Sequence, residues 1–338
     1  MPTSSAVILN EMPPSEDEKA RRIRRFIRRR EKRVVERHPA LARRDAMGAM
    51  LAALSVSGMV GLGWLYWMGR IPAYVCILGN AFFASILHEI EHDLIHFLYF
   101  KKRRAAHNAM MLIVWAFRGN VPHGWYRRKI HFHHHGVSGT TTDVEERLLG
   151  LGTPWGIRRL LMSVDGFLAF LLNARTLEQE IPGFRRRDLA LAAIPFYPAF
   201  AFVLVSFCIY HAELALGLTP SLVLQTLYPT ISLLAVAWVF PNYLRQTALQ
   251  IVSSNVHYYE DVRSLHEETQ VLHPVYLWPL QLFCFNFGTT HSLHHYVVEQ
   301  PFYVRQLIAP WVLPYLRKSG VRENDTGTFR RANRFALS

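Results

Sequence analysis

The stretch His88-Glu-Ile-Glu-His92-Asp-Leu-Ile-His96 ends an apolar run that begins near Ile71. Residues four apart on an α-helix differ by about 40° around its axis, so the three imidazoles share one face. They could be unrelated polar residues of an amphipathic helix. Ionisable side chains at membrane depth are costly, however, and usually serve a function. The stretch therefore predicts a metal-binding face where a membrane helix reaches water.

Two further clusters, His131-Phe-His-His134-His135 and His291-Ser-Leu-His294-His295, each contain the spacing H-x-x-H-H. On a helix this spacing places three rings within an arc of about 100°, which can chelate one metal or bridge two. A catalytic zinc needs three protein ligands and a structural zinc needs four, so this many imidazoles predict two metals. Imidazole suits iron, copper, zinc and nickel, and the ligand type alone does not choose among them.

Four segments are apolar over the roughly 20 residues that a membrane-spanning helix needs. They cover residues 46–68, 71–95, 189–216 and 221–243. Short Gly/Pro-containing breaks at 69–72 and 217–220 join them in pairs. We expect an all-α integral membrane protein with four transmembrane helices in two hairpins and a cytoplasmic helical cap that carries the histidine boxes.

The 338-residue chain carries a net charge of +13, and 51% of its residues are hydrophobic. With such long apolar segments, a basic balance favours a lipid surface or an acidic protein over nucleic acid. All of its lysines and arginines except Arg70 lie in 1–45, 97–187 and 241–338. The positive-inside rule therefore places both termini and the active site in the cytoplasm, and we assign the protein to a bacterial inner membrane.

This distribution predicts three parts: a basic N-terminal segment (1–45), a membrane domain (46–315) and a polar C-terminal tail (316–338). The arginine-rich centre of the first part is either a solvated charged helix or an interfacial anchor.

Carboxylates next to the histidine clusters are the natural partners for holding metal-bound rings. They are Glu89, Glu91, Asp93, Asp143, Glu145, Glu146, Glu260 and Asp261. Among them, Asp143, Glu146 and Asp261 are the candidate catalytic carboxylates. Arg127 and Arg128 precede the second cluster and are candidates for binding a substrate carboxylate, because a guanidinium can bind one with two parallel hydrogen bonds. A juxtamembrane basic cluster that meets phospholipid is the alternative.

The boxes His92-Asp-Leu-Ile-His96, His131-x-x-His134-His135 and His291-x-x-His294-His295 resemble those of the membrane fatty acid desaturase and hydroxylase superfamily. Asn255-Val-His257 resembles the additional histidine of that superfamily. The resemblance covers residues 46–315. It implies a non-haem di-iron centre that uses O2 to attack an unactivated C–H bond of a lipid chain. The ligands that it implies are His92, His96, His131, His134, His135, His257, His291, His294 and His295, with His88 as a further candidate and His133 left open.

Within the superfamily, the continuous stretch 88–96 and the tract 138–147 look most like the fatty acid decarboxylases that form terminal alkenes. This likeness implies oxidative decarboxylation of a medium-chain free fatty acid to a 1-alkene. A fatty acyl desaturase or an alkyl or fatty acid hydroxylase is the alternative. Because no flavin, haem-attachment or phosphate-loop motif is visible, we expect an external ferredoxin- or rubredoxin-like electron donor. Apolar residues of the second and fourth spans are the expected walls of an acyl tunnel: Phe82, Phe83, Trp238 and Phe240.

A different class of enzyme also matches part of the pattern. His88-Glu89-Ile-Glu-His92 satisfies H-E-x-x-H, in which two histidines bind zinc and the glutamate acts as base in a metalloprotease. A zinc membrane protease would leave both H-x-x-H-H clusters without a role. A non-enzymatic metal carrier is a third possibility, but it needs no pocket for an acyl chain.

Overall fold

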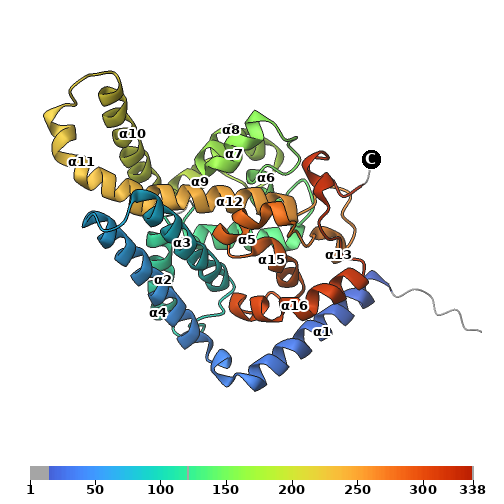
Figure 1. Ribbon diagram of the computed structural model, residues 1–338. Coiled ribbons are helices and arrows are strands. Elements are labelled where there is room, and N and C mark those ends of the chain that lie inside the picture. The colour runs from blue at the N-terminus through green and yellow to red at the C-terminus, as the bar shows by residue number, and fades with distance from the viewer. Residues whose placement is uncertain (1–14, 120–121, 337–338) are drawn as a thin grey trace, which may run out of the picture.

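The computed structural model describes residues 15–119 and 122–336, which are helices joined by short loops (Figure 1). Its α-helices in chain order are α1 (Glu16–Arg37), α2 (Arg44–Trp67), α3 (Ala73–Ile95), α4 (Arg104–Arg118), α5 (Gly124–Val137), α6 (Val144–Leu148), α7 (Ile157–Val164), α8 (Gly166–Glu180), α9 (Arg186–Leu191), α10 (Phe196–Ala215), α11 (Leu222–Leu234), α12 (Phe240–Val256), α13 (Leu265–Glu268), α14 (Trp278–Phe283), α15 (Phe287–Tyr296) and α16 (Phe302–Lys318). The shorter helical turns are η1 (Pro39–Ala42), η2 (Ala235–Val239), η3 (Val275–Leu277) and η4 (Thr326–Phe329). Across the described residues β-structure is limited to isolated bridges, so the prediction of an all-α protein is confirmed.

Four helices of the described chain are long and apolar enough to cross a membrane, as predicted: α2, α3, α10 and the continuous run Leu222–Val256. The third begins at Phe196 rather than near 189, because Pro195 interrupts the helical hydrogen bonding after α9. The fourth runs on to Val256, beyond the predicted end at 243. Figure 1 shows α10 and α11 extending away from the remaining helices, while α2 packs along α3.

The fourth apolar helix contains one π-helical turn, η2. Pro241 has no N–H to donate to the carbonyl of Ala237, four residues earlier, so a regular α-helix cannot pass this point unchanged. Nδ2 of Asn80 on α3 donates to that carbonyl at 2.7 Å instead. A polar residue inside one membrane helix thus satisfies the backbone that proline frees in another, as a low-dielectric environment requires.

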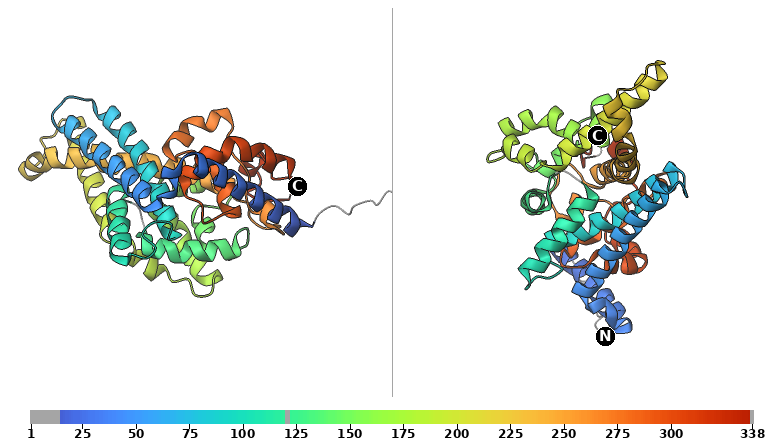
Figure 2. Two further views of the ribbon diagram at one scale, coloured as in Figure 1. Left: turned by 90° about the horizontal axis from the view of Figure 1, so that it is seen from below. Right: turned by 90° about the vertical axis from the view of Figure 1, so that its left-hand side faces the viewer.

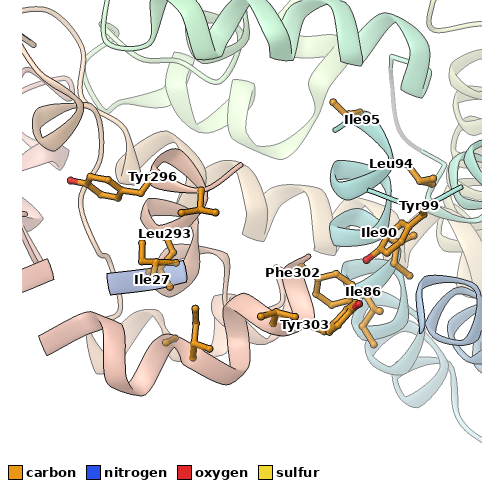
Figure 3. Packing of buried hydrophobic residues seen from close by; sticks show 14 of the residues in the cluster. Ile27, Ile86, Ile90, Leu94, Ile95, Tyr99, Leu293, Tyr296, Phe302 and Tyr303 are labelled. Atoms are coloured by element: carbon orange, nitrogen blue, oxygen red, sulfur yellow. The ribbon is translucent and has the colours of Figure 1, made fainter. Parts of the chain in front are cut away.

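Helix α3 has an apolar face and, on roughly the opposite side, a polar face that carries its histidines. Ile86, Ile90 and Leu94 recur every four residues and are offset by two from the histidine series, so they lie on roughly the opposite side of the helix. Figure 3 shows Ile86 and Ile90 beside Phe302 and Tyr303 of α16. The apolar face packs into the largest core of the protein, and this packing turns the polar face towards α5 and α15.

The basic helix α1 lies along α16 in the front view (Figure 1) and in the view from below (Figure 2). Ile23 and Ile27 are fully buried in the core shared with α16, while most of its arginines are exposed. Helix α1 is therefore docked on the protein through an apolar stripe. The two alternatives for its outer face, a solvated charged surface and an interfacial anchor, both stay predictions.

The segment that follows α16 packs back onto the end of α12. Asn333 is fully buried, and its Nδ2 donates to the carbonyl of Ser254. Nη2 of Arg159, on α7, donates to the carbonyl of Ser254 at 3.2 Å and to Oδ1 of Asn333. The described part of the C-terminal segment thus supports the backbone just before His257. The predicted domain boundaries at 45 and 315 stay predictions.

Candidate metal centre

Helices α3, α5 and α15, together with the end of α12, bring two groups of four histidines together. The first group is His92, His96, His131 and His294, and the second is His134, His257, His291 and His295. In each group the ring nitrogens that could bind a metal all lie within 4.8 Å of one another. The H-x-x-H-H spacing divides each box between the groups, since His131 and His134 differ by three residues and their rings point to neighbouring sites.

His135 lies between the two groups. Its Nε2 is 3.0 Å from Nε2 of His294, and its ring centroid is 5.2 Å from that of His295. All nine histidines implied by the resemblance therefore meet in one place.

Local backbone geometry aims two of these rings. Helix α12 ends at Val256, and the extended backbone of the next residue, His257 (φ −92°, ψ 150°), turns its side chain into the second group. Helix α15 begins at Phe287, and the ring of Phe287 stacks on His291 with a centroid separation of 4.1 Å. The aromatic contact limits rotation of His291.

Hydrogen bonds from Nδ1 fix the tautomers of four rings. His131 donates to Glu145 at 2.8 Å and His134 to Asp143 at 2.7 Å. The same nitrogen of His257 donates to the carbonyl of Ser253 at 3.0 Å, and that of His295 donates to Glu268 at 2.9 Å. In its neutral form an imidazole has only one N–H, so a neutral ring held in this way presents the lone pair of its Nε2 atom to its group.

These lone pairs face one another at close range in the second group. Nε2 of His257 is 2.9 Å from Nε2 of His291 and 3.3 Å from Nε2 of His295. Nε2 of His291 and of His295 are 3.1 Å apart. Since two of these three rings have their proton on Nδ1, the contacts cannot all be hydrogen bonds, and a cation among the nitrogens resolves the repulsion. The donor set therefore fits a transition metal that prefers imidazole, and iron is among these.

Most of these imidazoles are held neutral. Burial, and then the neighbouring imidazoles, lower the pKa values of His131 and His295 well below the usual range. The same causes lower the pKa of His135 to about 2. His134 differs: burial lowers its pKa, but Asp143 and Glu146 outweigh burial and raise it to about 10. Neutral rings are the form that binds metals, and the carboxylates beside His134 add the negative charge that a cation needs.

Asp143 and Glu146, two of the three candidate catalytic carboxylates, lie at the second group. Asp143 is fully buried against His134, and Glu146 Oε1 is 3.4 Å from His134 Nδ1 and 3.5 Å from His257 Nε2. Burial, and then the charge of Asp143, raise the pKa of Glu146 well above its usual value. Asp261, the third candidate, is exposed and belongs to neither group.

His88 lies outside both groups. Its Nδ1 is 2.9 Å from Nη1 of Arg118, and its Nε2 is 3.4 Å from Nη2 of Arg127. The ring shares the polar face of α3 with His92, as its spacing predicted, but α4 and α5 place guanidinium groups against it. The exposed His133 likewise belongs to neither group, and its Nε2 is 3.2 Å from the carbonyl of Thr142.

The two candidate substrate-binding arginines have different surroundings. Arg127 lines the cavity described below and contacts Glu91 at 3.3 Å. Arg128 donates to the carbonyls of Leu94 and Ile95, so it caps the C-terminal end of α3. The structure therefore places Arg127, and not Arg128, where a substrate could meet it.

An apolar cavity of about 1100 Å³, its mouth included, reaches both histidine groups. At one end it is lined by histidines of both groups: His92, His131, His134, His257 and His291. Its apolar walls come from α5, α6, α8, α9 and α12: Ile130, Leu148, Leu149, Phe167, Ala169, Phe170, Leu189, Ala190, Ala193 and Leu249. The cavity thus combines apolar walls with candidate metal ligands.

The cavity walls differ from those expected. Phe82 and Phe83, both on α3, pack against the largest core, and Trp238 and Phe240 pack with aromatic residues of α10. Much of the apolar wall comes instead from α8 and α9. These helices are too short or too polar to be predicted from the sequence as walls of a tunnel.

Sequence reasoning also missed Glu268 and Arg305. Glu268 holds His295, and Arg305 Nη1 lies 3.1 Å from Nδ1 of His294. Arg305 in turn contacts Glu89 at 3.0 Å and Asp93 at 3.5 Å. Two carboxylates of the first box thus pair with an arginine rather than with a histidine, and no sequence signal identifies that partner.

Comparisons with known proteins agree with this geometry. Residues 66–327 match the model of one protein family, described as fatty acid desaturase. The matched region is more than half of the chain and includes every histidine of the two groups. A comparison with curated proteins found no match.

Proposed function

The chain belongs to the fatty acid desaturase family, and from this premise we propose that it is a membrane-bound, O2-dependent non-haem di-iron oxidase of fatty acids. The observation that carries the proposal is the pair of buried four-histidine groups at the end of an apolar cavity. The proposed ligands are the eight members of the groups and His135. When bound, the two irons supply the activation of O2 and the redox chemistry that an unactivated C–H bond requires.

The residues of the chain itself bind and orient the substrate. The apolar walls hold the alkyl chain and exclude water, and Arg127 meets a carboxylate at the histidine end. Asp143 and Glu145 hold the rings of His134 and His131, and Glu146 contributes charge beside His257. A substrate that enters in this way presents the carbons next to its carboxyl group to the metal centre.

We infer that the product is a 1-alkene, formed by oxidative decarboxylation of a medium-chain free fatty acid. The reaction removes a hydrogen near the carboxyl end, breaks the bond to the carboxyl carbon and releases CO2. The fatty acid gives up two electrons, and an external donor supplies two more, which together reduce O2 to two waters. Desaturation or hydroxylation of a fatty acid or acyl chain is the second candidate, because it uses the same histidine boxes and the same electron balance.

Product analysis tests this choice. The purified protein, with lauric acid, O2 and an electron-donor system, should release a terminal alkene one carbon shorter than the substrate. Finding only an internal alkene or a hydroxy acid would assign the protein to the second candidate.

The zinc protease reading has less support. His88 and His92, the two histidines that would bind the zinc, do not belong to one group. Glu89, which would act as the base, forms an ion pair with Arg305. Metal analysis separates the classes: about two irons per chain support the oxidase, whereas one zinc supports the protease and weak, exchangeable metal supports a carrier.

We propose that electrons enter from a ferredoxin- or rubredoxin-like protein. A second hollow reaches the metal centre on the side of α1, and its lining includes Arg24, His96, His135 and His295. Candidate metal ligands are thus accessible beside an arginine-rich helix, to which an acidic carrier is attracted.

The proposed topology places the four apolar helices as two hairpins in a bacterial inner membrane, with both termini and the helical cap cytoplasmic. The distribution of basic residues supports it. Reporter fusions at the two termini and after Gly217 would test the orientation, and a cytoplasmic signal from residue 217 would reverse it.

A further inference from the structure

Arg245 is a buried charge that the site described so far does not use. It lies on α12 within the candidate span Leu222–Val256 and has no exposed surface. Nη1 and Nη2 have no hydrogen-bond partner in the described part of the chain, and Nε is 3.5 Å from Oδ1 of Asn242. An unpaired buried guanidinium is strongly destabilising, and ionisable residues inside membrane helices are usually functional.

Two other guanidiniums share one buried carboxylate close by. Arg118 contacts Glu91 through Nη2 at 2.7 Å and through Nε at 2.6 Å. Nη1 of Arg127 is 3.3 Å from the same carboxylate, and its Nε is 4.0 Å from Glu145, whose other oxygen accepts from His131. All three arginines lie within electrostatic range of His88. Positive charge therefore exceeds negative charge in this cluster, which favours binding of an anion.

The cluster adjoins the cavity at its histidine end. Arg127 and His88 line the cavity, as do Gln246 and Leu249, which lie one and four residues after Arg245 on α12. The part of the lining that comes from α8 and α9 is apolar. The cavity lining thus has an anion-attracting part and an apolar part, which matches the two parts of a fatty acid.

We propose that Arg127 and Arg245 together bind the free carboxylate of the substrate, with the Arg118–Glu91 pair holding the cluster in place. The selected class is unesterified straight-chain monocarboxylic acids. Esters, alkanes and acyl thioesters carry no anion at this position. The proposal rests on the proposed function only in that the cavity must hold an acyl chain, and it does not depend on which product forms.

The test compares two ligands that differ in charge. Binding of laurate and of methyl laurate to the purified full-length protein in lipid nanodiscs is measured by calorimetry. The unmodified protein should bind laurate at least about tenfold more tightly than methyl laurate. Arg245→Met should lower laurate affinity by about tenfold or more and leave methyl laurate binding unchanged. It should also raise the melting temperature of the ligand-free protein, because it removes an unpaired buried charge.

Arg159→Met is the matched control. Arg159 is also fully buried, but its guanidinium is paired with the carbonyls of Thr153 and Ser254 and with Asn333. This variant should lower the melting temperature and keep the preference for laurate. Arg127→Gln is a second variant at the more accessible arginine, and it should lose the preference as Arg245→Met does.

Retention of the full preference for laurate in both Arg245→Met and Arg127→Gln would overturn the proposal. A lower melting temperature in Arg245→Met with an unchanged preference would also overturn it. If the variants lose laurate binding but the unmodified protein converts laurate to a hydroxy acid or an internal alkene, decarboxylation is wrong and the carboxylate site stands.

Discussion

The two histidine groups differ in what lies behind their rings. In the second group, three rings donate from Nδ1 to an acceptor: His134 to Asp143, His257 to the carbonyl of Ser253, and His295 to Glu268. In the first group, only His131 donates to a carboxylate, Glu145. His294 faces the guanidinium of Arg305, and Nδ1 of His92 has no partner among the described residues.

The groups also differ in exposure, because His96 is partly exposed while all four members of the second group are buried. An acceptor at Nδ1 fixes the tautomer and raises the basicity of a metal-binding imidazole, whereas a cation at Nδ1 lowers it. The difference teaches that equal numbers of histidines do not make equal sites. We expect the second group to hold its metal more tightly and the first to exchange its metal more easily.

Removing one ligand from either group should have the largest effect. His134→Ala and His294→Ala should each lower activity at least about hundredfold, since even loss of an outer partner costs 10- to 100-fold. Bound iron, measured by metal analysis, should fall in both variants. His211→Ala is the control, because His211 is exposed and bonds to Tyr228 on the α10–α11 hairpin. Normal iron content and turnover in both box variants would refute the ligand assignment.

Chelation tests the inequality of the groups directly. A chelator added to the iron-loaded protein should remove metal in two phases whose rates differ by about tenfold or more. His96→Ala should abolish the fast phase and leave the slow one. A single phase that accounts for all of the iron would show that the two sites are equivalent despite their different surroundings.

Asp143→Asn should make the second group resemble the first. The amide keeps the size of the side chain but removes the negative charge behind His134, and iron affinity at this site should fall about 10- to 100-fold. The slow chelation phase should become faster. Asp188→Asn, on α9 and away from both groups, provides a charge-matched control that should leave both phases unchanged. An unaltered slow phase in Asp143→Asn would mean that this carboxylate does not support the metal.

A substitution at the exposed side of the candidate metal centre should have a smaller effect on activity. Arg24→Glu, at the hollow that reaches His96 and His135, should raise the KM for a reduced acidic carrier several-fold, because rim charges mainly affect association. The rate with a small chemical reductant should not change. An increase with both donors would indicate damage to the site rather than loss of docking.

The smallest effect concerns the cavity, which reaches both groups. Ala169→Val narrows the wall on α8 and should shift the preferred fatty acid to a chain shorter by about one to three carbons, with iron content unchanged. Ala174→Val, on the same helix and equally buried but outside the cavity wall, is the matched control. Equal chain-length profiles for the two variants would place the acyl chain elsewhere.

The sequence by itself determined the helical class, the four apolar helices and the histidines that meet. These features depend on local signals: runs of apolar residues, Gly/Pro breaks, and spacings of three and four that fix which rings share a helix face. Even the offset between Ile86, Ile90 and the histidine series of α3 can be read from the sequence. Boundaries were less certain where a proline acts, as at Pro195 and at Pro241, whose freed carbonyl is satisfied by Asn80 from another helix.

Only the tertiary structure decided which residues stand behind and beside the rings. His88 has the spacing of a metal ligand. Its two ring nitrogens, however, contact the guanidinium groups of Arg118 and Arg127, which belong to other helices. Glu268 and Arg305 are remote in sequence from the boxes that they complete, and the cavity wall comes from α8 and α9. Periodicity fixes the direction of a side chain on its own helix, but packing between helices decides what it meets.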